Sequence, residues 1–258
     1  MLDPAHIGLG LLSGALVGFT LGLVGGGGSI LAVPLMVYVV GVGNPHVAIG
    51  TSALAVAVNA ATGLVQHARA HTVRWRCGLM YAGAGVLGAL GGSTLGKNFD
   101  GQKLLFLFAI LMVVVGVLML RSRAQRGNPD ARCNRQNAPK MLAYGLGTGG
   151  FSGFFGIGGG FLIVPGLIAA TDMAMINAVG TSLVAVTAFG LTTAANYAFS
   201  GLVDWILAIT FIAGGVAGGF FGTAAARKLS GGSALKTVFA LLIFAVAAYM
   251  LYRSGSAL

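Results

Sequence analysis

The sequence predicts an all-α polytopic membrane protein made of two inverted repeats, each with a glycine-rich broken-helix hairpin and three transmembrane helices. Three observations lead to this fold class. The first is composition, because 57% of the 258 residues are hydrophobic and only 8% are charged, against about 25% charged in soluble domains. The second is a series of long apolar segments. The third is a glycine tract at residues 25–28 that returns 131 positions later at 156–160.

The long apolar segments match the thickness of a bilayer, since about 20 apolar residues in a helix cross a hydrocarbon core of about 30 Å. The first segment lacks a basic leader, so we expect it to be retained rather than cleaved. Expected spans lie near residues 5–24, 47–68, 77–96, 103–120, 176–199, 205–226 and 235–252. Shorter apolar segments near 29–43, 141–155 and 160–171 predict hairpins that either cross fully or re-enter.

Matched motifs in the two halves indicate an internal duplication. Pro34 and Pro165 follow the two glycine tracts at the same spacing. Residues 48–52 and 178–182 then share an alanine and a Gly-Thr-Ser sequence. We therefore divide the chain into a first membrane repeat (1–121), a basic linker (122–140) and a second membrane repeat (141–258).

The distribution of basic residues predicts the orientation of the repeats. The stretch 121–140 holds five arginines and one lysine against a single aspartate, so the positive-inside rule places the linker in the cytoplasm. Counting crossings outward, the basic loops at 69–76 and 227–236 both face the cytoplasm only if the second repeat is inverted. An odd number of crossings per repeat produces that inversion.

Each glycine tract, at 25–28 and at 156–160, is expected to form the tip of a hairpin. These two glycine tips are the predicted substrate site. A helix that starts after each tract directs unpaired backbone N–H groups and its positive dipole end into the space between the hairpins, which favours an anion. Glycine also leaves the backbone open to a ligand. The neighbouring hydroxyls either donate to the ligand or bond to their own or an adjacent helix. The predicted substrate-binding residues are Gly26, Gly27, Gly28, Ser29, Thr51, Ser52, Gly158, Gly159, Gly160, Thr181 and Ser182.

Missing residue types argue against other functions. The chain has no glutamate, and its five aspartates fall at predicted segment ends or loops, which disfavours a cation substrate. The net charge of +10 follows the membrane topology and does not form a nucleic-acid-binding face. The two cysteines show neither metal-ligand spacing nor an obvious disulfide partner. With no catalytic cluster in the spans, we expect no enzymatic activity, cofactor or metal.

Isolated polar residues within the spans have a simpler expected role. Asn59, Gln66 and Asn196 are predicted to make hydrogen bonds between helices. His67, near a helix end, is a candidate for proton coupling, although a structural histidine at the membrane interface is the favoured reading.

Taken together, the duplicated motifs resemble the sulfite exporter TauE/SafE family of membrane transporters over nearly the whole chain. The likeness rests on Gly25-Gly26-Gly27-Gly28-Ser29 with Pro34, on the two Gly-Thr-Ser motifs, and on Gly201-Leu202-Val203-Asp204-Trp205. This resemblance implies a permease of the bacterial inner membrane for small sulfur-containing anions, such as sulfite or organosulfonates. Alternating access around a midplane site between the hairpins is the implied mechanism.

Other interpretations remain open from the sequence. An anion channel would need a continuous pore and no coupling, and a membrane-embedded protein without transport activity would not need duplicated helix breaks. The expected partners are the lipid bilayer and a small anion, with no nucleic acid. The sequence leaves the oligomeric state open, a homodimer included.

Overall fold

In the computed structural model, the described residues are 4–121, 128, 133–134, 136–157, 160–228 and 233–255. Within these ranges every named element is a helix, which confirms the all-α prediction. The first half contains α1 (Pro4–Val24), the 3₁₀ helix η1 (Gly25–Leu31), α2 (Ala32–Pro34), the π-helix η2 (Leu35–Val39), α3 (Pro45–Arg69), α4 (Trp75–Lys97) and α5 (Gly101–Arg121). The second half contains α6 (Ala138–Phe155), α7 (Gly160–Thr171), α8 (Met175–Ala198), α9 (Trp205–Lys228) and α10 (Ser233–Gly255).

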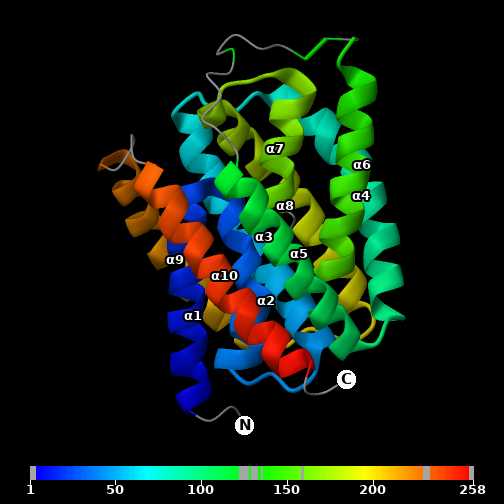
Figure 1. Ribbon diagram of the computed structural model, residues 1–258, viewed down its shortest axis with the longest axis vertical. Helices are drawn as coiled ribbons and strands as arrows, with labels where there is room; N and C mark the ends of the chain where they lie inside the picture. Colours follow the sequence, from blue (N-terminus) through cyan, green and yellow to red (C-terminus); the bar gives the residue numbers. More distant parts are fainter. Residues whose placement is uncertain are drawn as a thin grey trace.

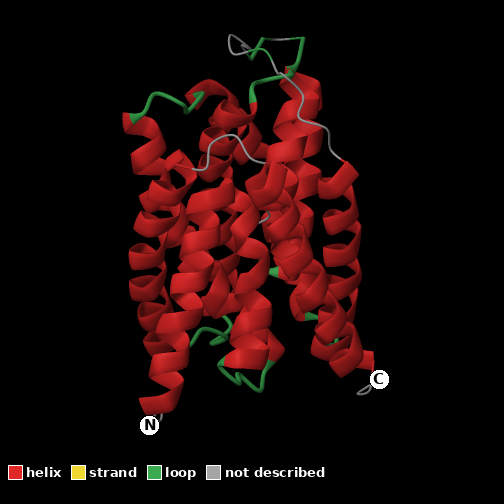
Figure 2. Cartoon of the chain, turned by 60° about the vertical axis from the view of Figure 1, so that its left-hand side comes forward, coloured by secondary structure: helices red, strands yellow, loops and turns green. Residues whose placement is uncertain are grey.

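The helices form a bundle whose loops gather at its two ends (Figure 2). Among the described residues, α1, α3, α5, α8 and α9 are long and apolar enough to cross a membrane. The expected span in α4 has the length for a crossing, 23 residues, but its many glycines lower the mean hydropathy. In α10 the described apolar stretch is the shorter Ile243–Arg253. The chain is therefore a multi-pass membrane protein.

Both glycine tracts interrupt helices, as the sequence predicts. The first tract forms a tight 3₁₀ helix rather than an open loop. At the second, α6 ends because Gly156 adopts a left-handed φ of 69°, which glycine tolerates without strain. The apolar helices that follow, Gly28–Val39 and Gly160–Thr171, each rise about 18 Å. That length falls short of a hydrocarbon core of about 30 Å, so the second arm of each hairpin is shorter than a full crossing.

Backbone contacts at glycines join α1 to α9. A methyl group added at Gly14 or Gly18 would collide with the carbonyl oxygens of Phe211 and Gly215. The contact is mutual, because Gly214, Gly218 and Gly222 on α9 lie against the carbonyl oxygens of Leu11, Ala15 and Phe19 on α1. Small residues at such an interface let two membrane helices pack backbone to backbone.

The same kind of contact joins α4 to α6. Gly88 and Gly92 on α4 lie against the carbonyl oxygens of Leu146 and Gly150 on α6. In return, Gly145, Gly149 and Gly153 on α6 lie against the carbonyl oxygens of Tyr81, Gly85 and Ala89 on α4. We call these two interfaces the α1/α9 seam and the α4/α6 seam. Each seam joins one helix from each half of the chain, so neither half packs independently of the other.

Between the seams, α3 and α8 pack against each other and are the two most buried spans. Outside them, α5 packs against α10. The chain begins at the lower end of the bundle with α1, whereas α6 begins at the upper end (Figure 1). Helices α1 and α6 therefore enter the bundle from opposite ends.

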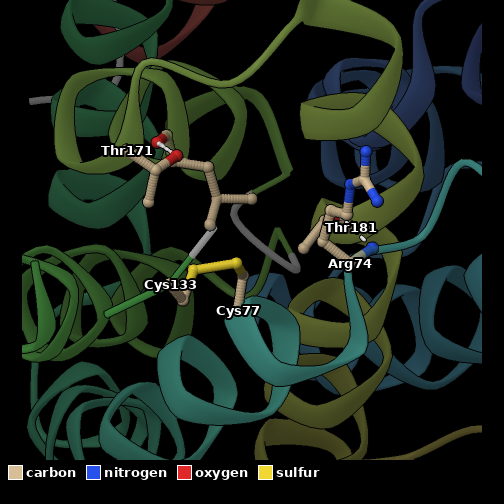
Figure 3. Close-up of a disulfide and its surroundings, with 6 residues drawn as sticks. Arg74, Cys77, Cys133, Thr171 and Thr181 are labelled. Carbon is tan, nitrogen blue, oxygen red and sulfur yellow. Dashed lines mark hydrogen bonds between the residues drawn. A yellow bond between two sulfur atoms is a disulfide. The ribbon is translucent and has the colours of Figure 1, made fainter. Parts of the chain in front are cut away.

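One contact corrects the sequence analysis, which found no disulfide partner for either cysteine. Cys77, at the start of α4, is bonded to Cys133 of the linker, with the Cα atoms 5.5 Å apart (Figure 3). The two are separated by 56 positions, and no spacing rule identifies such a pair. The disulfide ties the linker to the bundle at the end where α4 begins.

The seams predict opposite outcomes for two adjacent glycines in α4. An alanine at position 92 would collide with the backbone of α6, whereas position 91 has no atom within 4 Å of an added Cβ. We expect Gly92→Ala to lower the free energy of unfolding by about 1–3 kcal/mol and Gly91→Ala to leave it unchanged or raise it slightly. Thermal melting in detergent measures both. Equal melting temperatures for the two variants would show that the seam is not closely packed.

The disulfide predicts a redox-dependent stability for the purified protein. We expect Cys77→Ser to lower the free energy of unfolding by about 2–4 kcal/mol under non-reducing conditions. Dithiothreitol should destabilise the wild type by a similar amount and leave the variant unaffected. Melting curves of both proteins with and without reductant provide the measurement. Identical wild-type curves in the two buffers would mean that the bridge does not form.

Candidate functional site

The structure brings the first glycine tract close to the helix that follows the second one. Helix η1 contacts α7, and Gly160 is buried at the start of α7. Around the first tract the packing is tight, because Gly28 and Ser29 are buried and a Cβ on Gly28 would strike the backbone of α1. Gly26 and Gly27 lie within η1, whereas the predicted site residues Gly158 and Gly159 fall outside the described residues. The first tract thus packs closely against α1 and contacts α7.

The threonines of the Gly-Thr-Ser motifs form a reciprocal pair of contacts between the halves. The hydroxyl of Thr51 on α3 accepts a hydrogen bond from the backbone N–H of Asp204 at 3.0 Å, just before α9 begins. The hydroxyl of Thr181 on α8 accepts one from the backbone N–H of Arg74 at 2.9 Å, just before α4 begins. Figure 3 shows this second contact beside Cys77. Each threonine therefore supplies an acceptor to a helix start in the other half.

The glycine before each threonine allows this approach. A Cβ on Gly50 would collide with the carbonyl oxygen of Leu202, and one on Gly180 would lie 2.8 Å from the hydroxyl oxygen of Thr72. The serines that follow bond within their own helices: Ser52 donates to the carbonyl oxygen of Ile49 at 3.0 Å, and Ser182 donates to that of Val179 at 2.7 Å. The motif packs helices onto loops of the opposite half, and its contact with substrate stays a prediction.

A narrow cleft lies beside the first glycine tract, between α1, α3 and α9. Its volume is about 10 Å³, roughly the room that one water molecule needs. The polar residues lining it are Asn59, Thr62, Gln66, His67 and Thr223, and the remaining lining residues are Gly18, Leu21, Gly22, Gly63, Leu183, Gly215 and Gly219. Among the described residues, no aspartate, glutamate, lysine or arginine lines the cleft, so its recognition chemistry there is that of neutral hydrogen-bonding groups.

Asn59 departs from its expected role. Its side chain is 3% exposed, and neither the amide nitrogen nor the amide oxygen has a hydrogen-bond partner. Asn196 does make the expected contacts between helices, because its amide donates to the hydroxyl of Ser93 at 2.6 Å and its oxygen accepts from Lys97 at 2.8 Å. Of these two amides, only Asn196 confirms the prediction. Asn59 instead lines the cleft without the expected contact between helices.

A comparison of the halves offers a signal that marks Asn59. With the Gly-Thr-Ser motifs aligned, Asn59 of the first half corresponds to Phe189 of the second. Both pack on an equivalent glycine, because a Cβ on Gly215 would collide with the Asn59 amide and one on Gly85 would collide with the Phe189 ring. Phe189 is fully buried and stacks on Tyr81. Two equivalent positions thus hold an amide in the first half and an aromatic ring in the second.

The fold defines a class, a multi-pass helical membrane protein with broken helices, and comparison with known proteins defines the family. The family model of the sulfite exporter TauE/SafE matches residues 10–250, so the chain belongs to that family. No solved structure matches the chain significantly.

Several curated relatives carry transporter names. A "Probable membrane transporter protein" of Xylella fastidiosa (strain Temecula1) is 54% identical over 250 residues, covering 95% of both chains. "Probable membrane transporter protein YunE" of Bacillus subtilis is 28% identical over 244 residues, covering 86% of this chain and 87% of that protein. "Probable membrane transporter protein MJ0441" of Methanocaldococcus jannaschii is 28% identical over 165 residues, covering 60% of each chain. The protein is accordingly a membrane transporter.

The reciprocal threonine contacts predict a loss of stability when the hydroxyls are removed. In Thr51→Val or Thr181→Val a partly buried backbone N–H loses its acceptor, so we expect the free energy of unfolding to fall by about 1 kcal/mol. Thr181→Ser should restore most of that loss. The control is Thr187→Val, because the hydroxyl of Thr187 donates only within its own helix, to the carbonyl oxygen of Leu183. Melting temperatures are measured in detergent. Equal values for Thr187→Val and Thr181→Val would show that the hydrogen bonds between the halves contribute no additional stability.

Proposed function

We propose that the protein is a secondary transporter of the bacterial inner membrane for small sulfur-containing anions such as sulfite or organosulfonates. Membership of the TauE/SafE family is the observation that carries this proposal. The transporter works by alternating access around a site near the glycine hairpins, which two oppositely oriented repeats supply. The linker at 122–140 faces the cytoplasm in this proposal because of its arginines. The Cys77–Cys133 bond would then face a reducing compartment, so we expect it in the purified protein under non-reducing conditions.

Two pairs of contacts support an inverted duplication. The α1/α9 seam and the α4/α6 seam are equivalent when the sequences of the two halves are aligned, because α1 then corresponds to α6 and α4 to α9. The bonds from Asp204 to Thr51 and from Arg74 to Thr181 are equivalent in the same way. Reciprocal pairs of this kind arise when two copies face each other across an approximate twofold axis. An axis in the membrane plane would give each copy the opposite orientation.

The choice of an anion rests on the placement of the acidic residues. The side chain of Asp204 accepts a hydrogen bond from the backbone N–H of Leu207, and that of Asp100 accepts from Gln102 and Lys103. Asp172 lies between α7 and α8. These carboxylates stand at helix starts or in loops, where none is available to hold a cation inside a span. Cation transporters ordinarily place acids within their spans.

A carrier fits the narrow cleft better than a channel does. An open channel needs a continuous wet path, whereas the cleft between α1, α3 and α9 has room for about one water molecule. Close packing around the first tract is expected of a carrier in an occluded conformation. We therefore place anion channels second.

Counterflow in proteoliposomes tests the function. Vesicles containing the purified protein are loaded with unlabelled solute and diluted into labelled sulfite, sulfate, sulfoacetate or chloride, with and without a pH gradient. We expect accumulation of labelled sulfite or sulfonate above that in protein-free vesicles, and inhibition of it by the unlabelled solute. A channel would conduct without counterflow, and absence of flux for every sulfur anion would contradict the proposal.

A further inference from the structure

We infer that a small oxyanion binds in the cleft between α1, α3 and α9, where the amide of Asn59 donates a hydrogen bond to it. This inference rests on the proposed function. It places the transported ligand in this cleft and not at the equivalent position of the second half. The starting observation is the buried amide of Asn59, whose two polar atoms have no hydrogen-bond partner. An unsatisfied buried amide is costly, by an amount comparable to a lost hydrogen bond. A ligand that accepts from it would remove that cost.

The surroundings of Asn59 select the class of ligand. The lining residues include no acid and no base other than His67. The hydroxyl of Thr62 donates to the backbone oxygen of Asn59 at 2.7 Å, and that of Thr223 donates to the backbone oxygens of Gly219 and Phe220. These hydroxyl protons are therefore occupied. The amide N–H groups of Asn59 and Gln66 remain the donors suited to a ligand, and donors without a nearby carboxylate favour an oxyanion.

The packing explains how the cleft can admit a solute larger than water. Helices α1 and α9 are joined backbone to backbone along the α1/α9 seam, so they move as one unit. Helix α9 contacts α3 less extensively than its counterpart α4 contacts α8. The weaker interface is the one that holds the cleft. Separation of the α1/α9 pair from α3 widens the space beside Asn59 without breaking either seam.

The equivalent crevice in the second half is closed to the same chemistry. Phe189 fills the position of Asn59 there and is fully buried against Tyr81. At the far end of that crevice, Asn196 bonds to Ser93 and to Lys97. An aromatic ring presents no N–H donor to an anion. The two halves, although equivalent in backbone, therefore differ in their ability to bind a solute.

Two substitutions at Asn59 separate a ligand role from a packing role. Asn59→Leu keeps the approximate size and removes the unsatisfied amide, so we expect a higher melting temperature together with a loss of sulfite counterflow of about tenfold or more. Asn59→Asp places a carboxylate in the cleft, and we expect it to abolish anion binding and flux by charge repulsion. The measurements are counterflow in proteoliposomes, anion-induced thermal stabilisation, and elution as a single species in gel filtration.

The matched control makes the same amide-to-acid change at Asn196. Its oxygen already lies 2.8 Å from Nζ of Lys97, so Asn196→Asp forms an ion pair outside the cleft and should retain near wild-type flux. If both Asn59 variants keep wild-type flux and apparent affinity, the cleft assignment is overturned while the proposed function stands. If the wild type moves none of the sulfur anions, the proposed function falls and the oxyanion assignment falls with it. If Asn59→Asp does not fold, Asn59→Leu alone decides between these outcomes.

Discussion

Backbone contact between the two halves is the constraint on which the rest of the structure depends. In each seam, glycines from one half lie against carbonyl oxygens of the other, so close that a single added methyl group has no space. In a lipid environment, where burying apolar side chains gains little, such contacts supply the packing that holds helices together. The seams set the spacing of α1 against α9 and of α4 against α6, and α3 and α8 fill the space between these pairs.

The threonine contacts extend this interlocking to the helix starts. Thr51 and Thr181 each complete the first turn of a helix that belongs to the opposite half. If the two halves had equivalent side chains as well as equivalent backbones, both would bind a solute in the same way. They differ at the buried position where Asn59 lines a cleft and Phe189 stands in the other half. That difference assigns the polar surface for a solute to one crevice only.

Composition and local pattern were sufficient to predict the all-α membrane class and the two helix breaks, because hydropathy and glycine act over a few residues. The close contacts at Gly88, Gly92, Gly218 and Gly222 were also predictable from their spacing. The sequence did not reveal the Cys77–Cys133 bond or the partners of Thr51 and Thr181, because these contacts join residues 56 to 153 positions apart. Asn59 was assigned to helix packing since a buried amide usually finds a partner. Its lack of one depends on how α1, α3 and α9 come together, although its pairing with Phe189 was visible in the sequence.

A structure of the transporter with selenite, an oxyanion that resembles sulfite and carries a heavy atom, tests the central claim most directly. The anomalous signal of selenium locates the solute without reference to any mutation. We predict one selenium peak between α1, α3 and α9, within hydrogen-bond distance of the Asn59 amide. A peak beside Phe189 in the other crevice, or one held only by the glycine tips, would contradict the account.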